Sequence, residues 1–287
     1  MIIDHLHSDK STLAVCSLVS RTWRNSGQFH LLESVTLLGV TSEKGLEEFL
    51  ACAQQSPRIR RYVRALRVHG EGSWFGKYDD TELHELCLGP QHLRSLAEMP
   101  ALRRLCLFDL LWDSHRDGPE SLSLIRQTGV TRVLEKLVLQ RMTSYQFQEP
   151  GEIHHGIYAQ DVLDILSFFS EIGVLYFSTP RFEVDGCEVP LPHVEDSFLQ
   201  LQFPPRLRVG ALVTDPDALD NVRSSMAYSM LDRVCRLNGL HTFRAKIKLG
   251  DIETVSHFVL MRASSLRHYQ LDMSAYFSLI QLGESFA

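Results

Sequence analysis

A recurring pattern of apolar positions runs through most of the chain. An apolar residue is followed by two variable residues, a second apolar residue, one variable residue and a third. The last two share one face of an extended strand, so each unit predicts a strand with one buried face. The units are Leu32/Val35/Leu37, Val63/Leu66/Val68, Leu102/Leu105/Leu107, Leu134/Leu137/Leu139, Ile172/Leu175/Phe177, Leu240/Phe243/Ala245 and Leu266/Tyr269/Leu271. Leu207/Gly210/Leu212 fits poorly but stands where a unit is due.

Helical patterns separate these strands. Residues 43–55 and 161–172 carry apolar side chains at helical spacing. Asp215-Pro216-Asp217 predicts the start of a helix that runs toward Leu237, and the proline-containing stretch 180–205 is expected to be irregular. Strand and helix alternating at this period predict an α/β fold, with parallel strands stacked in a solenoid.

The first 24 residues predict a small helical unit. A short apolar stub is followed by a polar turn and an amphipathic helix, for which Ser11 is the expected N-cap. This helix is expected to end on Leu18-Val19-Ser20-Arg21-x-Trp23-Arg24, with its two arginines at the negative end of the helix dipole. A unit of this size cannot bury all its apolar side chains against itself. It must therefore pack on the body of the protein or on a partner.

This segment resembles the latter part of an F-box, the adaptor-binding motif of cullin-type ubiquitin ligases. The stub, turn and helix come in the F-box order, and Leu18-Val19-Ser20-Arg21-x-Trp23-Arg24 matches the end of that motif. F-boxes usually begin with Leu-Pro-x-Glu ahead of the first helix, whereas this sequence starts inside that helix. Because the family uses the missing residues in adaptor contact, two expectations stay open: a functional F-box, or a decayed one that no longer binds the adaptor.

The repeats are similar to those of fungal F-box proteins with divergent leucine-rich repeats. Successive units start 26 to 39 residues apart, a longer and less regular period than the usual 20–29 residues. The resemblance implies an F-box-like helical segment at residues 1–40 and a degenerate leucine-rich-repeat-like solenoid at 41–287. It further implies a non-catalytic, substrate-recruiting subunit of a Skp-cullin-F-box ubiquitin ligase. Such a subunit binds a Skp-type adaptor, and through it a cullin, and holds an unknown target protein for ubiquitin-dependent degradation.

Two sets of candidate contact residues follow. The adaptor-facing or adaptor-supporting set is Ile3, Leu6, Leu13, Cys16, Leu18, Val19 and Trp23. The target-binding set comprises residues that alternate with the buried positions of the strands and therefore point outward: Arg67, His69, Phe108, Gln140, Tyr176, Arg244 and Lys246. Aromatic residues that follow successive strands, among them Trp112, either form a binding edge or fold back onto the core.

Composition limits the other possibilities. The formal charge of −6 argues against general affinity for nucleic acid or acidic membranes, so the cluster of arginines at 58–67 is best explained as a solvated edge. No apolar run approaches the roughly 20 residues that span a bilayer, and there is no signal peptide, so we expect a cytoplasmic or nuclear protein. Six scattered cysteines without a C-x-x-C pair predict no metal site.

Catalytic motifs are also missing from the sequence. Gly70-x-Gly72-x-x-x-Gly76-Lys77 has the wrong spacing for a nucleotide fingerprint, and there is no G-x-S-x-G elbow. No cofactor is expected. The alternative functions are a repeat-built protein-binding module without a ligase role and, less favoured, an enzyme on a repeat-like fold.

Overall fold

The structure is a computed structural model that describes residues 6, 9–38, 44–70, 87–114, 116, 132–144, 157–178, 182–183, 207–215, 231, 239–247 and 252–272. These residues form seven helices and 13 strands. The helices are α1 (Lys10–Val19), α2 (Arg21–Leu32), α3 (Lys44–Gln55), α4 (Pro57–Tyr62), α5 (Pro90–Ala97), α7 (Ala159–Ser167) and α10 (Ile252–Arg262). The chain therefore has the predicted α/β character.

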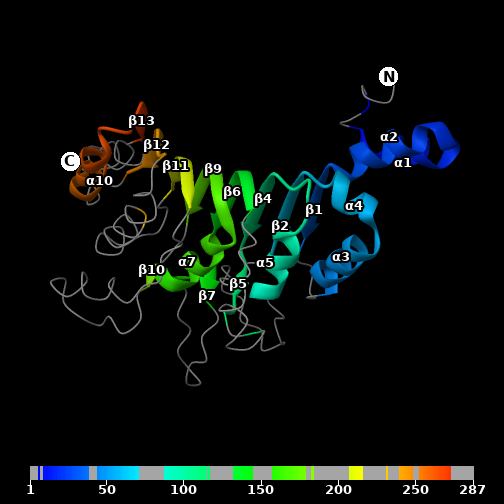
Figure 1. Cartoon of the computed structure of the whole chain (residues 1–287), viewed down its shortest axis with the longest axis horizontal. Coiled ribbons are helices and arrows are strands. Elements are labelled where there is room, and N and C mark those ends of the chain that lie inside the picture. Colours follow the sequence, from blue (N-terminus) through cyan, green and yellow to red (C-terminus); the bar gives the residue numbers. More distant parts are fainter. Residues whose placement is uncertain are drawn as a thin grey trace, which may run out of the picture.

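One large sheet organises the molecule (Figure 1). Its eight strands are β1 (Ser34–Leu38), β2 (Ala65–His69), β4 (Arg104–Phe108), β6 (Arg132–Gln140), β9 (Phe169–Ser178), β11 (Arg208–Thr214), β12 (Thr242–Lys246) and β13 (His268–Asp272). Every neighbouring pair is parallel, and the spatial order of the strands is their order in the chain. Because β1 is the first strand, the sheet begins inside the segment 1–40.

Two small sheets lie beside the large one. The first joins β3 (Cys87–Leu88), β5 (Leu111–Trp112) and β7 (Thr143–Ser144), and the second joins β8 (Ile157–Tyr158) and β10 (Phe182–Glu183). The turns that lead into β5 and β7 contain Asp109 and Arg141, whose φ angles of 54° and 52° are in the left-handed region. The Arg141 guanidinium donates to the Asp109 carboxylate at 2.5 Å, which ties these two turns together.

The predicted strands are confirmed, with one error of register. Leu66, Leu105, Leu137 and Leu175 stand in one row across the sheet. The row continues through Leu212, which the sequence pattern placed at the third position of its unit; the unit is therefore Val209/Leu212/Thr214, two residues later than predicted.

The predicted helices are partly confirmed. Residues 44–55 form α3, within one residue of the expectation. The prediction of a helix over 161–172 was wrong at its end: α7 stops at Ser167, because residues 169–178 form strand β9. Apart from Asp215 and Leu231, the predicted helix from Asp215 to Leu237 lies outside the described residues, as does nearly all of the stretch 180–205.

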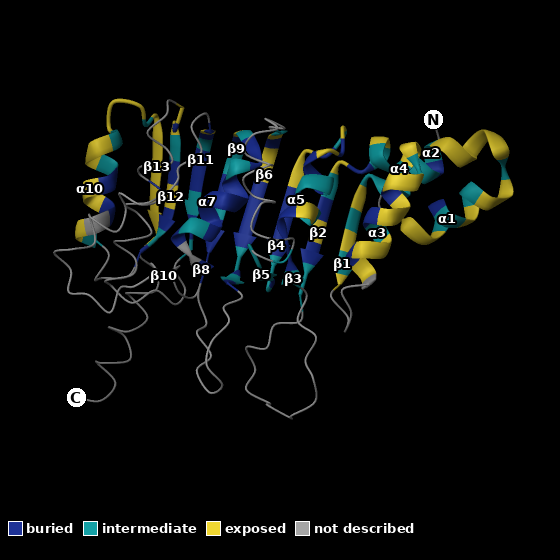
Figure 2. Ribbon diagram, turned by 60° about the horizontal axis from the view of Figure 1, so that its bottom comes forward, coloured by how far each residue is buried: buried dark blue, intermediate teal, exposed yellow. Residues whose placement is uncertain are grey.

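The core lies on one side of the large sheet. Helices α3, α5, α7 and α10 each contribute buried apolar side chains to a single cluster with the inward-facing strand residues, as the dark blue in Figure 2 shows. Trp112 of β5 is fully buried in this cluster. It therefore folds back onto the core and does not form part of a binding edge. None of the described helices is long and apolar enough to cross a membrane.

One register position near the N-terminal ends of the large strands forms a column of residues, which we call the rim: Glu33, Arg64, Arg103, Glu135, Gly173 and Gly210. The carbonyls of Glu33, Arg64 and Arg103 each accept two successive amides of the next strand. Gly173 and Gly210 occupy the same column, where backbones approach closely. A Cβ at residue 173 would stand 2.7 Å from the carbonyl oxygen of Glu135, so only glycine fits there without a shift of the backbone.

Candidate functional site

The first candidate surface lies on α1 and α2, beyond the β1 end of the sheet (Figure 1). Asp9, and not the predicted Ser11, is the N-cap of α1. Its carboxylate accepts the backbone amide of Thr12 at 3.0 Å and the hydroxyls of Ser11 at 2.8 Å and Thr12 at 2.6 Å. These bonds, with that of the Thr12 hydroxyl foremost, lower the pKa of Asp9 from 3.8 to about 2.

Replacing Thr12 by Val is therefore expected to raise the pKa of Asp9 toward 3.8, because the variant loses the hydroxyl that contributes most. Since the folded-state pKa is depressed, the cap stabilises α1 above pH 3.8, and this stabilisation is lost as the pH falls through about 2. A titration of the Asp9 carboxyl carbon by NMR measures the shift. Ser11→Ala should move the pKa less, and equal pKa values in Thr12→Val and the parent protein would contradict the cap.

The Val-Ser-Arg-x-Trp-Arg segment does not end a helix, as predicted, but links two. Helix α1 stops at Val19, Ser20 is extended (φ −134°, ψ 129°), and α2 starts at Arg21. The two arginines therefore lie in the first turn of α2, at the positive end of its dipole, and the predicted dipole stabilisation is absent. Helix α2 then leads through Glu33 directly into β1.

The structure divides the predicted adaptor set, which the sequence left undivided. Leu13 is fully buried and supports the contact between α1 and α2, where Gly27 lies against the Leu13 backbone. In contrast, Leu18, Val19 and Trp23 are exposed by 87%, 73% and 45%. Leu6 and Cys16 are half-buried, and Ile3 lies outside the described residues.

One further residue, Val15, belongs with the exposed members. It is 58% exposed and lies one helical turn before Val19 on the same face of α1. Its spacing of four residues from Val19 was visible in the sequence, but the predicted adaptor set did not include it. We call Val15, Leu18, Val19 and Trp23 the helical patch.

The second candidate surface is the face of the large sheet opposite the core. All seven predicted target-binding residues alternate with buried strand residues, and none of the seven is buried. The strand register places Arg67, Tyr176 and Arg244 in one row, and His69, Phe108, Gln140 and Lys246 in the next row toward the strand ends. No described helix covers this open face, but the register alone does not show that it binds a target.

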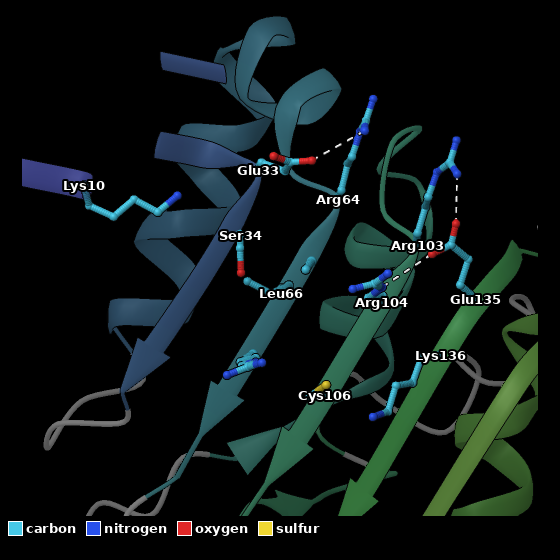
Figure 3. A pocket seen from close by; sticks show the side chains of 12 residues that line it. Lys10, Glu33, Ser34, Arg64, Leu66, Arg103, Arg104, Cys106, Glu135 and Lys136 are labelled. Atoms are coloured by element: carbon cyan, nitrogen blue, oxygen red, sulfur yellow. Dashed lines mark hydrogen bonds and ion pairs between the residues drawn. The ribbon is translucent and has the colours of Figure 1, made fainter. Parts of the chain in front are cut away.

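The open face is strongly cationic near β2, β4 and β6 (Figure 3). An open hollow of about 600 Å³ lies there between the strands and α1. Its charged lining residues are the cations Lys10, Arg64, Arg67, Arg103, Arg104 and Lys136 and the carboxylates Glu33 and Glu135. We call this the cationic hollow. Of these charged residues, only Arg67 was predicted from the sequence to contact a target. Arg104 and Lys136 could have been predicted too, because each directly precedes a buried leucine and therefore points outward from the sheet.

The carboxylates of the cationic hollow pair with arginines at the rim. Glu135 accepts hydrogen bonds from Arg103 at 2.8 Å and from Arg104 at 3.4 Å, and these partners, Arg103 foremost, lower the pKa of Glu135. Glu33 and Arg64 form a looser ion pair at 3.5 Å. Lys10 donates instead to the backbone carbonyl of His30. Within the described part of the chain, Arg67 and Lys136 have no carboxylate partner.

The open face becomes apolar at Cys106, which lines the cationic hollow, and at Val138 beside it. Cys106 and Val138 are only 8% and 5% exposed, and their row continues to Tyr176. The rings of His69 and Phe108 stack with centroids 4.3 Å apart. Burial lowers the pKa of His69, which favours the neutral imidazole in this stack, and burial also raises the pKa of the Cys106 thiol.

A polar cluster follows at the far side of the apolar row. The Tyr176 hydroxyl donates to Asp215 at 3.3 Å, and the Lys246 ammonium lies 3.5 Å from the other oxygen of that carboxylate. Asp215, which the sequence suggested as a helix cap, thus links β9 and β12 through its side chain. No group of three or more potential metal ligands occurs among the described residues.

The two candidate surfaces differ in their chemistry. The helical patch offers exposed apolar side chains, and the open face offers a cationic, then an apolar, then a polar area on one parallel sheet. Comparison with known proteins identifies no family: no protein-family model matches the chain, and no curated protein matches it.

Proposed function

We propose that this protein is a non-catalytic, substrate-recruiting subunit of a Skp-cullin-F-box ubiquitin ligase. In this proposal the helical patch docks on a Skp-type adaptor, and the open face of a leucine-rich-repeat-like solenoid holds the target protein. The observation that carries the proposal is the helical patch: four apolar side chains stand exposed around the Val-Ser-Arg-x-Trp-Arg segment that resembles the F-box.

The exposure of these side chains supports a partner. Leu18 and Val19 end α1 and Trp23 lies in the first turn of α2, so the break at Ser20 brings the two helix ends together. A cluster of exposed apolar residues on a soluble protein commonly marks a protein interface, and tryptophan is enriched among residues that dominate binding energy. The buried Leu13 holds the two helices in place beneath them.

The strand order supports the solenoid part of the proposal. Each strand of the large sheet pairs only with the strands before and after it in the chain, as stacked repeats require. The inward residues of successive strands form one continuous core, and the outward residues form one continuous face. Such extended faces are the surfaces by which repeat proteins hold their ligands.

A binding assay with a purified Skp-type adaptor tests the proposal. The parent chain is expected to bind, and a Val19→Asp, Trp23→Ala variant is expected to bind at least about 30-fold more weakly, because it loses one or more contacts worth roughly 2 kcal/mol. Leu260→Asp is the matched control: Leu260 on α10 is 73% exposed, as is Val19, but lies at the opposite end of the sheet.

The outcomes separate the two candidate functions. Loss of binding in the Val19→Asp, Trp23→Ala variant alone would support the ligase subunit. No binding by the parent chain, even after a Leu-Pro-x-Glu segment is added before residue 1, would contradict it. The open face with its cationic hollow does not depend on the adaptor, and such a result would favour a repeat-built protein-binding module without a ligase role.

A further inference from the structure

The cationic hollow is the most strongly charged part of the open face. Six cations and two carboxylates line it, although the whole chain has a net charge of −6. The cations come from three strands, the rim and α1, so the fold brings together charges that are far apart in the sequence (Figure 3).

This clustering does not stabilise the free protein. Arg104 and Lys136 are directly opposite one another on β4 and β6, and Arg67 is on the neighbouring strand β2. Like charges directly opposite on adjacent strands repel one another. The rim carboxylates offset part of this repulsion, but among the described residues Arg67 and Lys136 have no carboxylate partner. An anionic ligand would remove the repulsion that remains.

Glu135 shows what kind of anion fits. Its carboxylate is held by Arg103 and Arg104 through hydrogen bonds of 2.8 and 3.4 Å, at the border of the hollow. Arginine binds carboxylates through paired, directional N–H donors. The border of the hollow thus already binds one carboxylate, from β6, through two arginines of the β4 segment.

We propose that the cationic hollow and the apolar row beside it bind an extended segment of the target protein that carries acidic residues followed by apolar residues. The acidic residues would lie over Arg67, Arg104 and Lys136, and the apolar residues over Cys106 and Val138. This inference rests on the proposed function in one respect, that the open face holds a target protein. It adds the chemistry by which the target is recognised.

A peptide is favoured over a nucleic acid because the cations are interrupted. A phosphate backbone needs a continuous track of cations, whereas the row that starts at Arg67 continues with Cys106, Val138, Tyr176 and Val213 before the next cation, Arg244. A peptide can present its carboxylates to the hollow and its apolar side chains to the row beside it.

Fluorescence anisotropy with the full chain tests the inference. The probe is a fluorescein-labelled peptide with a run of glutamates followed by Val-Leu-Phe, compared with the same peptide carrying glutamines, with a phosphoserine version, and with single-stranded oligothymidylate. We expect the glutamate peptide to bind tightest, and to bind more weakly as salt is added. Equal binding of the glutamine peptide, or tighter binding of the phosphoserine peptide or the oligonucleotide, would overturn the proposal.

Charge reversals locate the binding. Arg67→Glu and Lys136→Glu are each expected to weaken binding of the glutamate peptide about tenfold or more, since an attraction becomes a repulsion at short range. Arg58→Glu is the matched control, because it changes the net charge equally but is exposed on α4, outside the hollow. Circular dichroism establishes that each variant is folded. Equal weakening in all three variants would show only a long-range charge effect and would refute the assignment.

Failure of this inference can be distinguished from failure of the proposed function. The charge reversals lie on the open face and leave the helical patch unchanged, so adaptor binding should persist in Arg67→Glu. If the adaptor binds and the glutamate peptide does not, the acidic-segment inference fails and the ligase proposal stands. If the peptide binds and the adaptor does not, the ligase proposal fails and the hollow remains a peptide site.

Discussion

Trp112→Ala is expected to destabilise the protein by about 3–5 kcal/mol, the usual cost of removing a buried aromatic ring. Among the described residues, Trp112 is the largest of the fully buried side chains, and it joins the three-stranded sheet to the main core. The truncation leaves a cavity that β5 and its neighbours can fill only in part. Urea denaturation followed by far-ultraviolet circular dichroism measures the loss, because it does not depend on the tryptophan that has been removed.

Trp112→Phe is the matched control for that variant. It keeps most of the apolar ring and removes the indole N–H, which has no hydrogen-bond partner among the described residues. The variant should therefore lose less than about 2 kcal/mol. A cost below about 1 kcal/mol for Trp112→Ala itself would mean that the ring is not part of the core, and would restore a binding-edge role for this position.

Gly173→Ala is expected to destabilise the protein by about 2–3 kcal/mol, near the upper end for overpacking. The added Cβ would stand 2.7 Å from the carbonyl oxygen of Glu135, and that oxygen belongs to the backbone of the neighbouring strand, which cannot rotate away. Strand β9 pairs on both sides, with β6 and β11, so a shift would disturb the middle of the large sheet. The free energy of unfolding measured in urea checks this value.

Gly45→Ala provides the comparison for Gly173→Ala. Gly45 is exposed on α3, and an added Cβ meets nothing within 4 Å. There, alanine should leave stability unchanged or raise it by up to about 1 kcal/mol, because alanine favours the helix and glycine does not. Equal costs for the two substitutions would show that close backbone approach is not what requires glycine at residue 173.

Much of the fold follows from the sequence, because the buried strand positions repeat. The strands around Leu66, Leu105, Leu137 and Leu175 each show one apolar face, and this fixes their register. The pattern fails at β11, where residues 209–213 are all apolar or glycine, so that either alternation satisfies it. Only pairing with β9 and β12 selects the observed register.

The helical segment at residues 10–32 shows a different limit of prediction from the sequence. Amphipathic periodicity continues across Ser20, and neither Gly nor Pro marks the break. The Ser20 side chain contacts the Thr22 hydroxyl at 2.7 Å and makes no capping bond to the backbone, so no side-chain cap accounts for the start of α2. Which apolar residues are exposed depends on this break, and for this reason the adaptor set could not be divided into buried and exposed members from the sequence.

The sequence predicted which strand residues lie on the open face, but it did not predict the cluster of cations there. Alternation placed Arg67 and Tyr176 outward, but the cationic hollow depends on residues from the rim and from α1 that no strand pattern includes. Arg103 lines the hollow because the strands lie side by side in the sheet. Lys10 lines it because α2 connects α1 to β1. Such convergence is a property of tertiary structure, and a single sequence does not reveal it.

The linear order of the strands also governs how the protein opens. Each strand of the large sheet is hydrogen-bonded only to its neighbours in the chain, so β13 can detach without breaking any strand pair near β2. Local opening can therefore begin at either end and spread one unit at a time. A ligand lying across β2, β4 and β6 would join three of these units into one cooperative block. Binding would then oppose local unfolding at the end of the sheet that carries the helical patch.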